Sequence, residues 1–90
     1  MCIRDSLNTF ELKKYTYLDY PDIDFNNLKK FGIYYFPQNG INICSNSPSN
    51  EQGVLIVLSP YYTYQKFISN SIEFKRFYNF DTKIWTEWMR

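Results

Sequence analysis

Short segments in which apolar and polar residues alternate run through this chain and predict β-strands. The clearest is residues 72–79 (IEFKRFYN), where every second side chain falls on one face of a strand: Ile72, Phe74, Arg76 and Tyr78. The segment before it, residues 61–69 (YYTYQKFIS), is also strand-like, and Asn70-Ser71 lies between the two. This pair of segments therefore predicts a β-hairpin.

Further strands are predicted on both sides of this hairpin. Residues 54–59 form an apolar run typical of a buried strand, and residues 33–37 (IYYFP) and 84–89 are shorter candidates. Residues 9–20 alternate imperfectly and predict one strand or two short extended pieces. Asp24 is placed to cap a helical turn through Leu28 that Gly32 would end. Turn signals, including Asn39-Gly40, separate these segments.

The composition supports a β-rich fold. Aromatic residues make up 21% of the 90 residues and alanine, the best helix former, is absent. Strands at regular spacing with turns between them indicate an antiparallel arrangement. We therefore predict a mainly β protein: a small antiparallel sheet or sandwich with at most one short helical turn.

Charge and residue usage exclude several classes of function. The formal net charge of +1 gives no electrostatic basis for nucleic-acid binding. No apolar run approaches the roughly 20 residues of a membrane helix, so no membrane insertion is expected. There is no histidine, the commonest general base and metal ligand, and the three glycines are not clustered as in a phosphate-binding loop. We expect no metal and no cofactor. Cys44 is predicted to be a buried hydrophobe.

A catalytic role for the acidic residues is not favoured. Asp22 with Asp24, and Glu73 with Asp81 or Glu87, are the available carboxylate pairs. Glycoside hydrolysis needs two carboxylates at a defined separation, but Asp is also expected in turn-rich stretches such as residues 21–27. We predict that the chain is not an enzyme, with no catalytic residues.

The aromatic residues and one arginine are the best candidates for binding. Tyr61, Tyr62 and Tyr64 lie close together in sequence and are possible ligand-facing aromatics, although core packing explains most aromatic residues in a small protein. Arg76 on an apolar face must be paired or stacked, and a tryptophan is its best stacking partner. Strand alternation predicts that Trp85 and Trp88 point to opposite faces, with one closing the core and the other stacking on Arg76 or packing on a neighbouring chain.

The first six residues, MCIRDS, resemble the conceptual translation of a sequencing-library adapter, read as ATG TGT ATA AGA GAC AG. We interpret residues 1–6 as an artefact to be set aside before fold reasoning. Residues 7–21 are then an upstream strand or linker, residues 22–90 are the main β module, and the true gene is expected to continue upstream.

Several segments in order resemble the repeat of phage tail fibres and R-type bacteriocin fibres, the pyocin knob family. They are DFNNLKKFGIYYF, NSPSNEQGVLIVLS, YQKFIS, IEFKRFYN and WTEW, and they span about Asp22 to Met89. Besides Asp24, Asn27 and Leu28, the matching motif positions are Gly32, Tyr34, Tyr35, Pro48, Gly53, Gln65, Phe74, Arg76, Trp85 and Trp88. Lys29-Lys30 and residues 80–83 have no counterpart.

The resemblance implies a non-catalytic module of a phage or prophage tail fibre, extracellular when acting, that contributes to homotrimer assembly and host-surface recognition. The receptor would be a bacterial surface glycan or another surface molecule. Two alternatives remain open: a carbohydrate-binding module of a larger secreted bacterial protein, and a structural spacer of a fibre without its own ligand. Whether the motif residues serve structure or binding is also left open.

Overall fold

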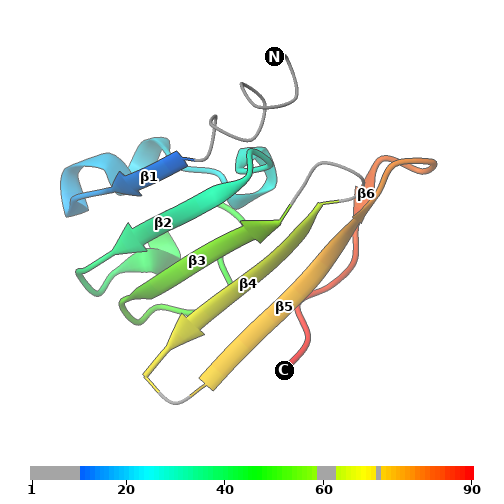
Figure 1. The fold of residues 1–90 in the computed structure, drawn as a ribbon. Helices are drawn as coiled ribbons and strands as arrows, with labels where there is room; N and C mark the ends of the chain where they lie inside the picture. The colour runs from blue at the N-terminus through cyan, green and yellow to red at the C-terminus, as the bar shows by residue number, and fades with distance from the viewer. Residues whose placement is uncertain (1–10, 59–62, 71) are drawn as a thin grey trace.

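Six strands form one continuous sheet whose order follows the sequence. In the computed structural model, which describes residues 11–58, 63–70 and 72–90, the strands are β1 (Glu11–Lys14), β2 (Gly32–Phe36), β3 (Gly53–Leu58), β4 (Tyr64–Ser69), β5 (Ile72–Asn79) and β6 (Ile84–Trp85). They lie side by side in the order β1 to β6 (Figure 1). The protein is therefore mainly β, as the residue pattern predicts.

All neighbouring strands pair antiparallel except the first two. β1 runs parallel to β2, with Glu11 opposite Gly32, so the sheet is mixed. A parallel pair needs a connection that crosses back over the sheet. Here that connection, residues 15–31, holds two short 3-10 segments, η1 (Tyr17–Asp22) and η2 (Phe25–Asn27). A third, η3 (Ile41–Ile43), lies between β2 and β3, so the chain has more short helical turns than the one expected.

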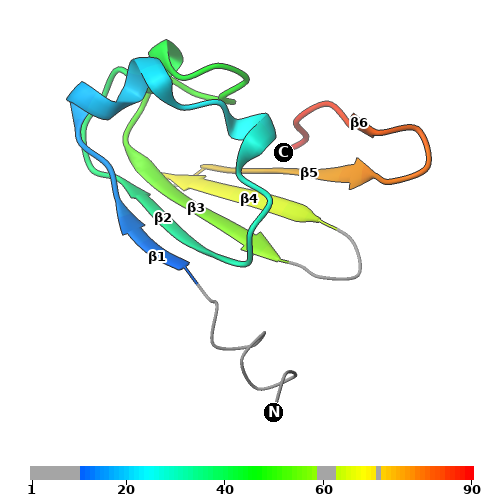
Figure 2. The same ribbon diagram turned by 90° about the horizontal axis from the view of Figure 1, so that it is seen from above.

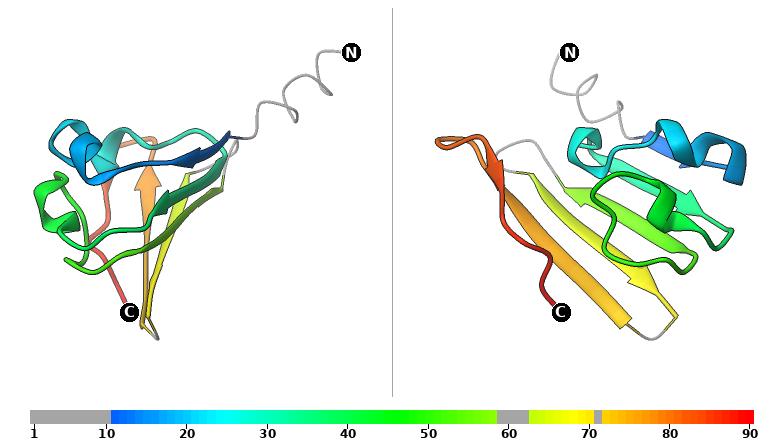
Figure 3. Two further views of the ribbon diagram at one scale, coloured as in Figure 1. Left: turned by 90° about the vertical axis from the view of Figure 1, so that its left-hand side faces the viewer. Right: turned by 180° about the vertical axis from the view of Figure 1, so that it is seen from behind.

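The three 3-10 segments and the C-terminal tail cover the same face of the sheet (Figures 2 and 3). We call this the inner face. The core lies between it and the covering segments, and it consists of nine buried residues: Tyr20, Phe25, Tyr34, Phe36, Ile41, Cys44, Leu55, Val57 and Phe67. Phe25 of η2 contacts Phe36 and Phe67 of the sheet, with ring centroids 5.1 and 5.8 Å away. One aromatic side chain thus attaches the covering layer to two strands.

The local predictions differ in how well they hold. β5 spans the predicted residues 72–79, and Asp24 caps η2 by accepting a hydrogen bond from the backbone N–H of Asn26 at 2.9 Å. Gly32 does not end that turn as predicted; it is the first residue of β2. A glycine is needed there because a side chain would overlap the backbone of Glu11. Residues 9–20 contribute only the four-residue strand β1 before η1 begins. Thr9, Phe10, Ser59, Ser71 and residues 1–6 lie outside the described residues.

Candidate functional site

Gln65 and Arg76 lie opposite each other on the inner face of the hairpin β4–β5. The Nε of Arg76 donates a hydrogen bond of 2.7 Å to the side-chain oxygen of Gln65. The amide nitrogen of Gln65 in turn donates to the carbonyls of Phe25 and Leu28, at 2.6 and 2.9 Å. Gln65 is fully buried, so its amide group satisfies the ends of η2 and holds the arginine at the same time.

The guanidinium of Arg76 lies between the two tryptophans. Its central carbon is 4.1 Å from the ring centroid of Trp85 and 4.4 Å from that of Trp88. Both distances fall within the range of favourable cation–π contacts. The prediction that Arg76 stacks on an indole is confirmed, but the prediction that the two indoles point to opposite faces is wrong.

The two indoles share a side because the tail has one more residue than β5 over the stretch where they pair. Trp85 pairs with Tyr78, and the backbone N–H of Thr86 donates to the carbonyl of Phe77. A regular ladder would then bring Trp88 opposite Lys75, but Met89 takes that place and exchanges two backbone hydrogen bonds with Lys75. An extra residue in one strand reverses the alternation of side chains beyond it. Trp88 therefore lies on the same side as Trp85.

Each indole also holds a loop of the covering layer. The Nε1 of Trp85 donates to the carbonyl of Asn26 at 3.2 Å, and that of Trp88 donates to the carbonyl of Asn46 at 2.9 Å. Trp88 additionally packs edge-on against Phe25 of the core. The two tryptophans thus fasten the C-terminal tail to segments 40 or more residues earlier in the chain.

Burial lowers the pKa of Arg76 to about 10, while the nearby Asp24 carboxylate acts in the opposite direction. Arg76 is only 4% exposed and no ion pair joins it to the acidic side chains of the described residues. It remains protonated at neutral pH, since a pKa of about 10 lies well above 7. The site therefore holds a buried positive charge that is stabilised by two indoles and one neutral amide.

An open groove of about 700 Å³ lies beside this cluster. Its walls come from η2, the loop after η3, β5 and the C-terminal tail, and the residues lining it are Asn26, Asn46, Ser47, Arg76, Lys83, Ile84, Trp85, Thr86, Glu87 and Trp88. We call it the tryptophan groove. Sequence reasoning singled out Arg76, Trp85 and Trp88 but not the asparagines, because nothing in their local sequence sets them apart from ordinary turn residues.

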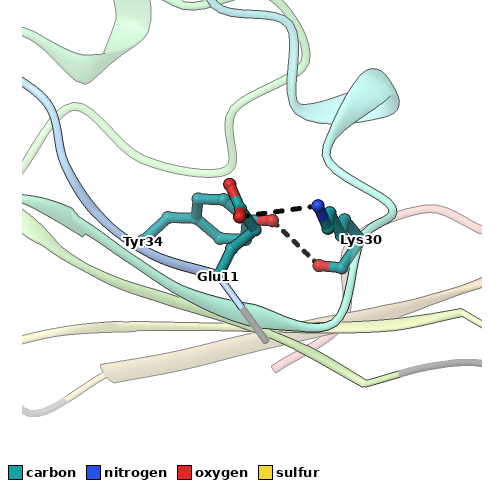
Figure 4. Close-up of polar contacts among 3 residues, drawn as sticks. All are labelled: Glu11, Lys30 and Tyr34. Atoms are coloured by element: carbon teal, nitrogen blue, oxygen red, sulfur yellow. Dashed lines mark hydrogen bonds and ion pairs between the residues drawn. The ribbon is translucent and has the colours of Figure 1, made fainter. Parts of the chain in front are cut away.

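Two further motif positions, Tyr34 and Gly53, pack within the fold. Tyr34 is buried, its hydroxyl donates to the carbonyl of Lys30 at 2.9 Å, and Lys30 also pairs with Glu11 at 3.5 Å (Figure 4). Burial raises the pKa of Tyr34 to about 12. A side chain at Gly53 would overlap the Ile68 carbonyl and come within 2.7 Å of the Phe67 ring. Gly53 thus allows close packing of Phe67 over the sheet.

Other predicted positions lie away from the tryptophan groove. Phe74 packs against the core from β5, and Pro48 lies half-buried in the loop after η3. Tyr35 and Tyr64 point to the face opposite the core, where Tyr64 contacts Phe77 with ring centroids 4.9 Å apart. Tyr61 and Tyr62 lie outside the described residues.

The described residues show no other site of recognisable chemistry. They contain no group of three His, Cys, Asp or Glu side chains placed to hold a metal ion. None of the helical segments in this part of the chain is long and apolar enough to span a membrane. Comparison with family models, with curated proteins and with solved structures found no match to this chain.

Proposed function

We propose that this chain is a non-catalytic recognition module of a phage or prophage tail fibre, which assembles as a homotrimer and binds a glycan or another receptor on the bacterial surface. One observation carries the proposal. Gln65, Arg76, Trp85 and Trp88, which are motif positions of the tail-fibre resemblance, converge into one site beside an open groove. A motif spread over 24 residues that meets at a groove is consistent with a shared ligand site.

The size and lining of the tryptophan groove favour recognition over a spacer role. Ligand sites for small molecules enclose roughly 300–1,000 Å³ and combine apolar walls with a few polar groups. The groove, at about 700 Å³, falls in this range and presents both indoles together with amide, hydroxyl and charged side chains. A fibre spacer would need none of these groups on its surface.

The sheet face opposite the core supports assembly of several copies. We call it the outer face, and cross-strand pairing places on it the apolar side chains of Leu12, Ile33, Tyr35, Val54, Ile56, Leu58, Tyr64, Ile68 and Phe77. No described 3-10 segment covers this face (Figures 2 and 3). A strand that is apolar on both faces, as β3 is, normally has both faces buried. In our proposal two further copies of the chain cover it.

Trimer formation would also raise the avidity with which the grooves bind a cell surface. Three linked copies of a weak site bind a surface bearing many identical glycans with an avidity roughly 100-fold or more above that of one site. The module therefore needs neither a large interface nor a tightly closed pocket at each groove.

A carbohydrate-binding module of a larger secreted bacterial protein is the second candidate. The tryptophan groove favours it equally, since indoles pack well on the apolar faces of sugars. The outer face separates the two functions, because a single carbohydrate-binding module does not need to bury a row of apolar side chains against its own copies.

Oligomeric mass with and without a charge on the outer face tests the proposal. Light scattering should give the mass of three chains, and Ile56→Lys, at the centre of the outer face, should give one folded chain. Leu18→Lys is the matched control, because Leu18 is 86% exposed in η1 and lies off the sheet. Labelled trimer should bind bacterial cells in flow cytometry, and the Ile56→Lys chain should bind at least about tenfold less. A wild-type monomer that binds cells would favour the second candidate.

A further inference from the structure

Two polar atoms at the wall of the tryptophan groove lack a partner. The Nη2 of Arg76 and the side-chain oxygen of Asn26 are shielded from solvent, and neither finds a hydrogen bond within the described part of the chain. Both residues line the groove. Buried polar atoms without partners cost free energy, and proteins keep few of them unless a ligand, ion or water completes the set.

We propose that the tryptophan groove binds a neutral sugar, whose ring hydroxyls pair with the Nη2 of Arg76 and the side-chain oxygen of Asn26. This inference rests on the proposed recognition function and names the chemical class of its ligand.

The two unpaired atoms select the kind of ligand because they have opposite requirements. The Nη2 of Arg76 needs an acceptor, whereas the Asn26 oxygen needs a donor. A carboxylate or phosphate accepts but cannot donate, so it would satisfy Arg76 and be repelled by the Asn26 oxygen. A hydroxyl does both, and a sugar ring presents several adjacent hydroxyls. Lys83 and Glu87 also line the groove and carry opposite charges, so the selection against an anion rests on the Asn26 oxygen.

The apolar walls fit the other surface of a sugar ring. Ile84 is 64% exposed and lines the groove next to Trp85. One face of each indole is occupied by Arg76. The C–H groups of a sugar would therefore contact the Ile84 side chain and the indole edges.

Entry of the ligand requires a small displacement of the groove wall, because both unpaired atoms are shielded. The C-terminal tail is the part best suited to move. Beyond β6 it is held to β5 only through Thr86 and the two backbone hydrogen bonds between Met89 and Lys75, and to the covering layer through the Trp88 indole. Segments with few backbone hydrogen bonds open at low free-energy cost.

Indole NMR signals give a direct test, since the Nε1–H groups of Trp85 and Trp88 report on the two sides of the site. The probes are glucose, galactose, mannose and N-acetylglucosamine, each titrated to high millimolar concentration, with glucuronic acid and N-acetylneuraminic acid as charged counterparts. We expect at least one neutral sugar to shift both indole signals, and neither acid to bind more tightly than its neutral relatives. Asn26→Leu should lower the affinity for that sugar by roughly tenfold, since it removes one hydrogen-bond partner.

Two further variants keep the test decisive. Asn42→Leu, in η3, is the matched control, because this exposed asparagine does not line the groove, and it should bind as the wild type does. Asn26→Asp keeps the size of the side chain. The new carboxylate should pair with the Nη2 of Arg76, which raises the melting temperature and takes both groups away from the sugar, so sugar binding should be lost. This variant decides the question if Asn26→Leu does not fold.

Binding of the acids alone, or of no probe, would overturn the inference, as would equal binding by Asn26→Leu and the wild type. The proposed recognition function is tested separately by the cell-binding measurement. If the trimer binds bacterial cells and Asn26→Leu binds them equally well, recognition stands and the sugar site lies elsewhere. If the trimer binds no cells, the recognition function itself fails.

Discussion

The two faces of the sheet are built on opposite principles. The inner face is closed by three 3-10 segments and the C-terminal tail, and it buries a polar pair, Gln65 and Arg76, at one end of an aromatic core. The outer face carries apolar side chains in the open, with Tyr35, Leu58 and Phe77 each at least 40% exposed. The inner face therefore combines an apolar core with polar groups that need exact partners, whereas the outer face leaves apolar side chains without a cover.

That difference separates what holds one chain together from what would join several chains. On the inner face the amide of Gln65 and the Nε of Arg76 depend on specific neighbours, so single substitutions there should destabilise the fold strongly. On the outer face most side chains are apolar, with the charged Lys66, Lys75 and Glu73 among them, so single substitutions should matter little to an isolated chain and more to an assembly. The following changes test this contrast, beginning with the largest expected effect.

Gln65→Leu should be the most damaging change on the inner face. It removes three hydrogen bonds, leaves the Arg76 guanidinium without a polar partner among the described residues, and removes the side-chain donor that pairs with the partly buried carbonyl of Leu28. A buried polar group left without its partner costs about 1–3 kcal/mol, and more if it is charged, so Gln65→Leu should cost at least about 3 kcal/mol in all. Urea unfolding followed by tryptophan fluorescence measures the loss.

Gln52→Leu is the control for Gln65→Leu, because Gln52 is exposed just before β3. It should change the free energy of unfolding by less than about 0.5 kcal/mol. If Gln65→Leu costs no more than the control, the cluster of Gln65, Arg76 and the tryptophans does not stabilise the inner face, and the contrast with the outer face disappears.

A second change concerns the alkaline stability of the inner face. Burial raises the pKa of the Cys44 thiol from 9.0 to about 11. The fold therefore favours the neutral thiol, and this contribution to stability is complete below pH 9 and is lost as the pH rises through 11. By linkage the free energy of unfolding should fall by about 1 kcal/mol between pH 8 and pH 10.

Cys44→Val isolates that effect, since valine fills a similar volume and does not titrate. The pH dependence between 8 and 10 should largely vanish in the variant, as measured by urea unfolding at each pH. Near pH 10 two further contributions begin and partly offset each other. Tyr15, Tyr20 and Tyr34, whose pKa values are raised by burial, begin to lower stability, while Arg76, with a pKa lowered to about 10, begins to raise it. An unchanged slope in Cys44→Val would assign the alkaline loss to another group.

The same two regions differ in how much of their structure could be predicted from the sequence. β5 was predictable to the residue, with Arg76 on the apolar face, because alternation and the Asn70 turn act locally. The positions of Trp85 and Trp88 were not, because the extra residue between Thr86 and Met89 depends on hydrogen bonds to β5 and leaves no mark on residue type. The parallel pairing of β1 was likewise hidden, since it is set by a crossover 17 residues long.

The candidate site divides in the same way. Arg76 and the tryptophans could be identified as unusual, because a charge on an apolar strand and two indoles near one end of the chain both need explanation. Asn26 could not, because asparagine after a capping Asp24 is ordinary turn chemistry. The burial of its side-chain oxygen without a hydrogen-bond partner is a property of the folded chain, and no local sequence pattern predicts it.

The smallest expected change in the free energy of unfolding comes from a substitution on the outer face, and it tests the contrast between the two faces most directly. Lys66 and Glu73 form an ion pair of 3.3 Å there, with side chains 34% and 55% exposed. In an isolated chain such a pair contributes about 0.2–1 kcal/mol and is screened by salt. Glu73→Gln should therefore change the unfolding free energy of dilute protein by no more than this, and 1 M NaCl should remove the difference.

The result should depend on protein concentration if copies of the chain cover the outer face. Burial strips water from the pair, and Lys66 without its partner then becomes an unpaired buried charge. Glu73→Gln should accordingly lower the melting temperature of concentrated protein more than that of dilute protein, whereas Gln65→Leu should lower both equally. An equal effect of Glu73→Gln at all concentrations would mean that this part of the outer face stays in water, and the trimer would have to form through another surface.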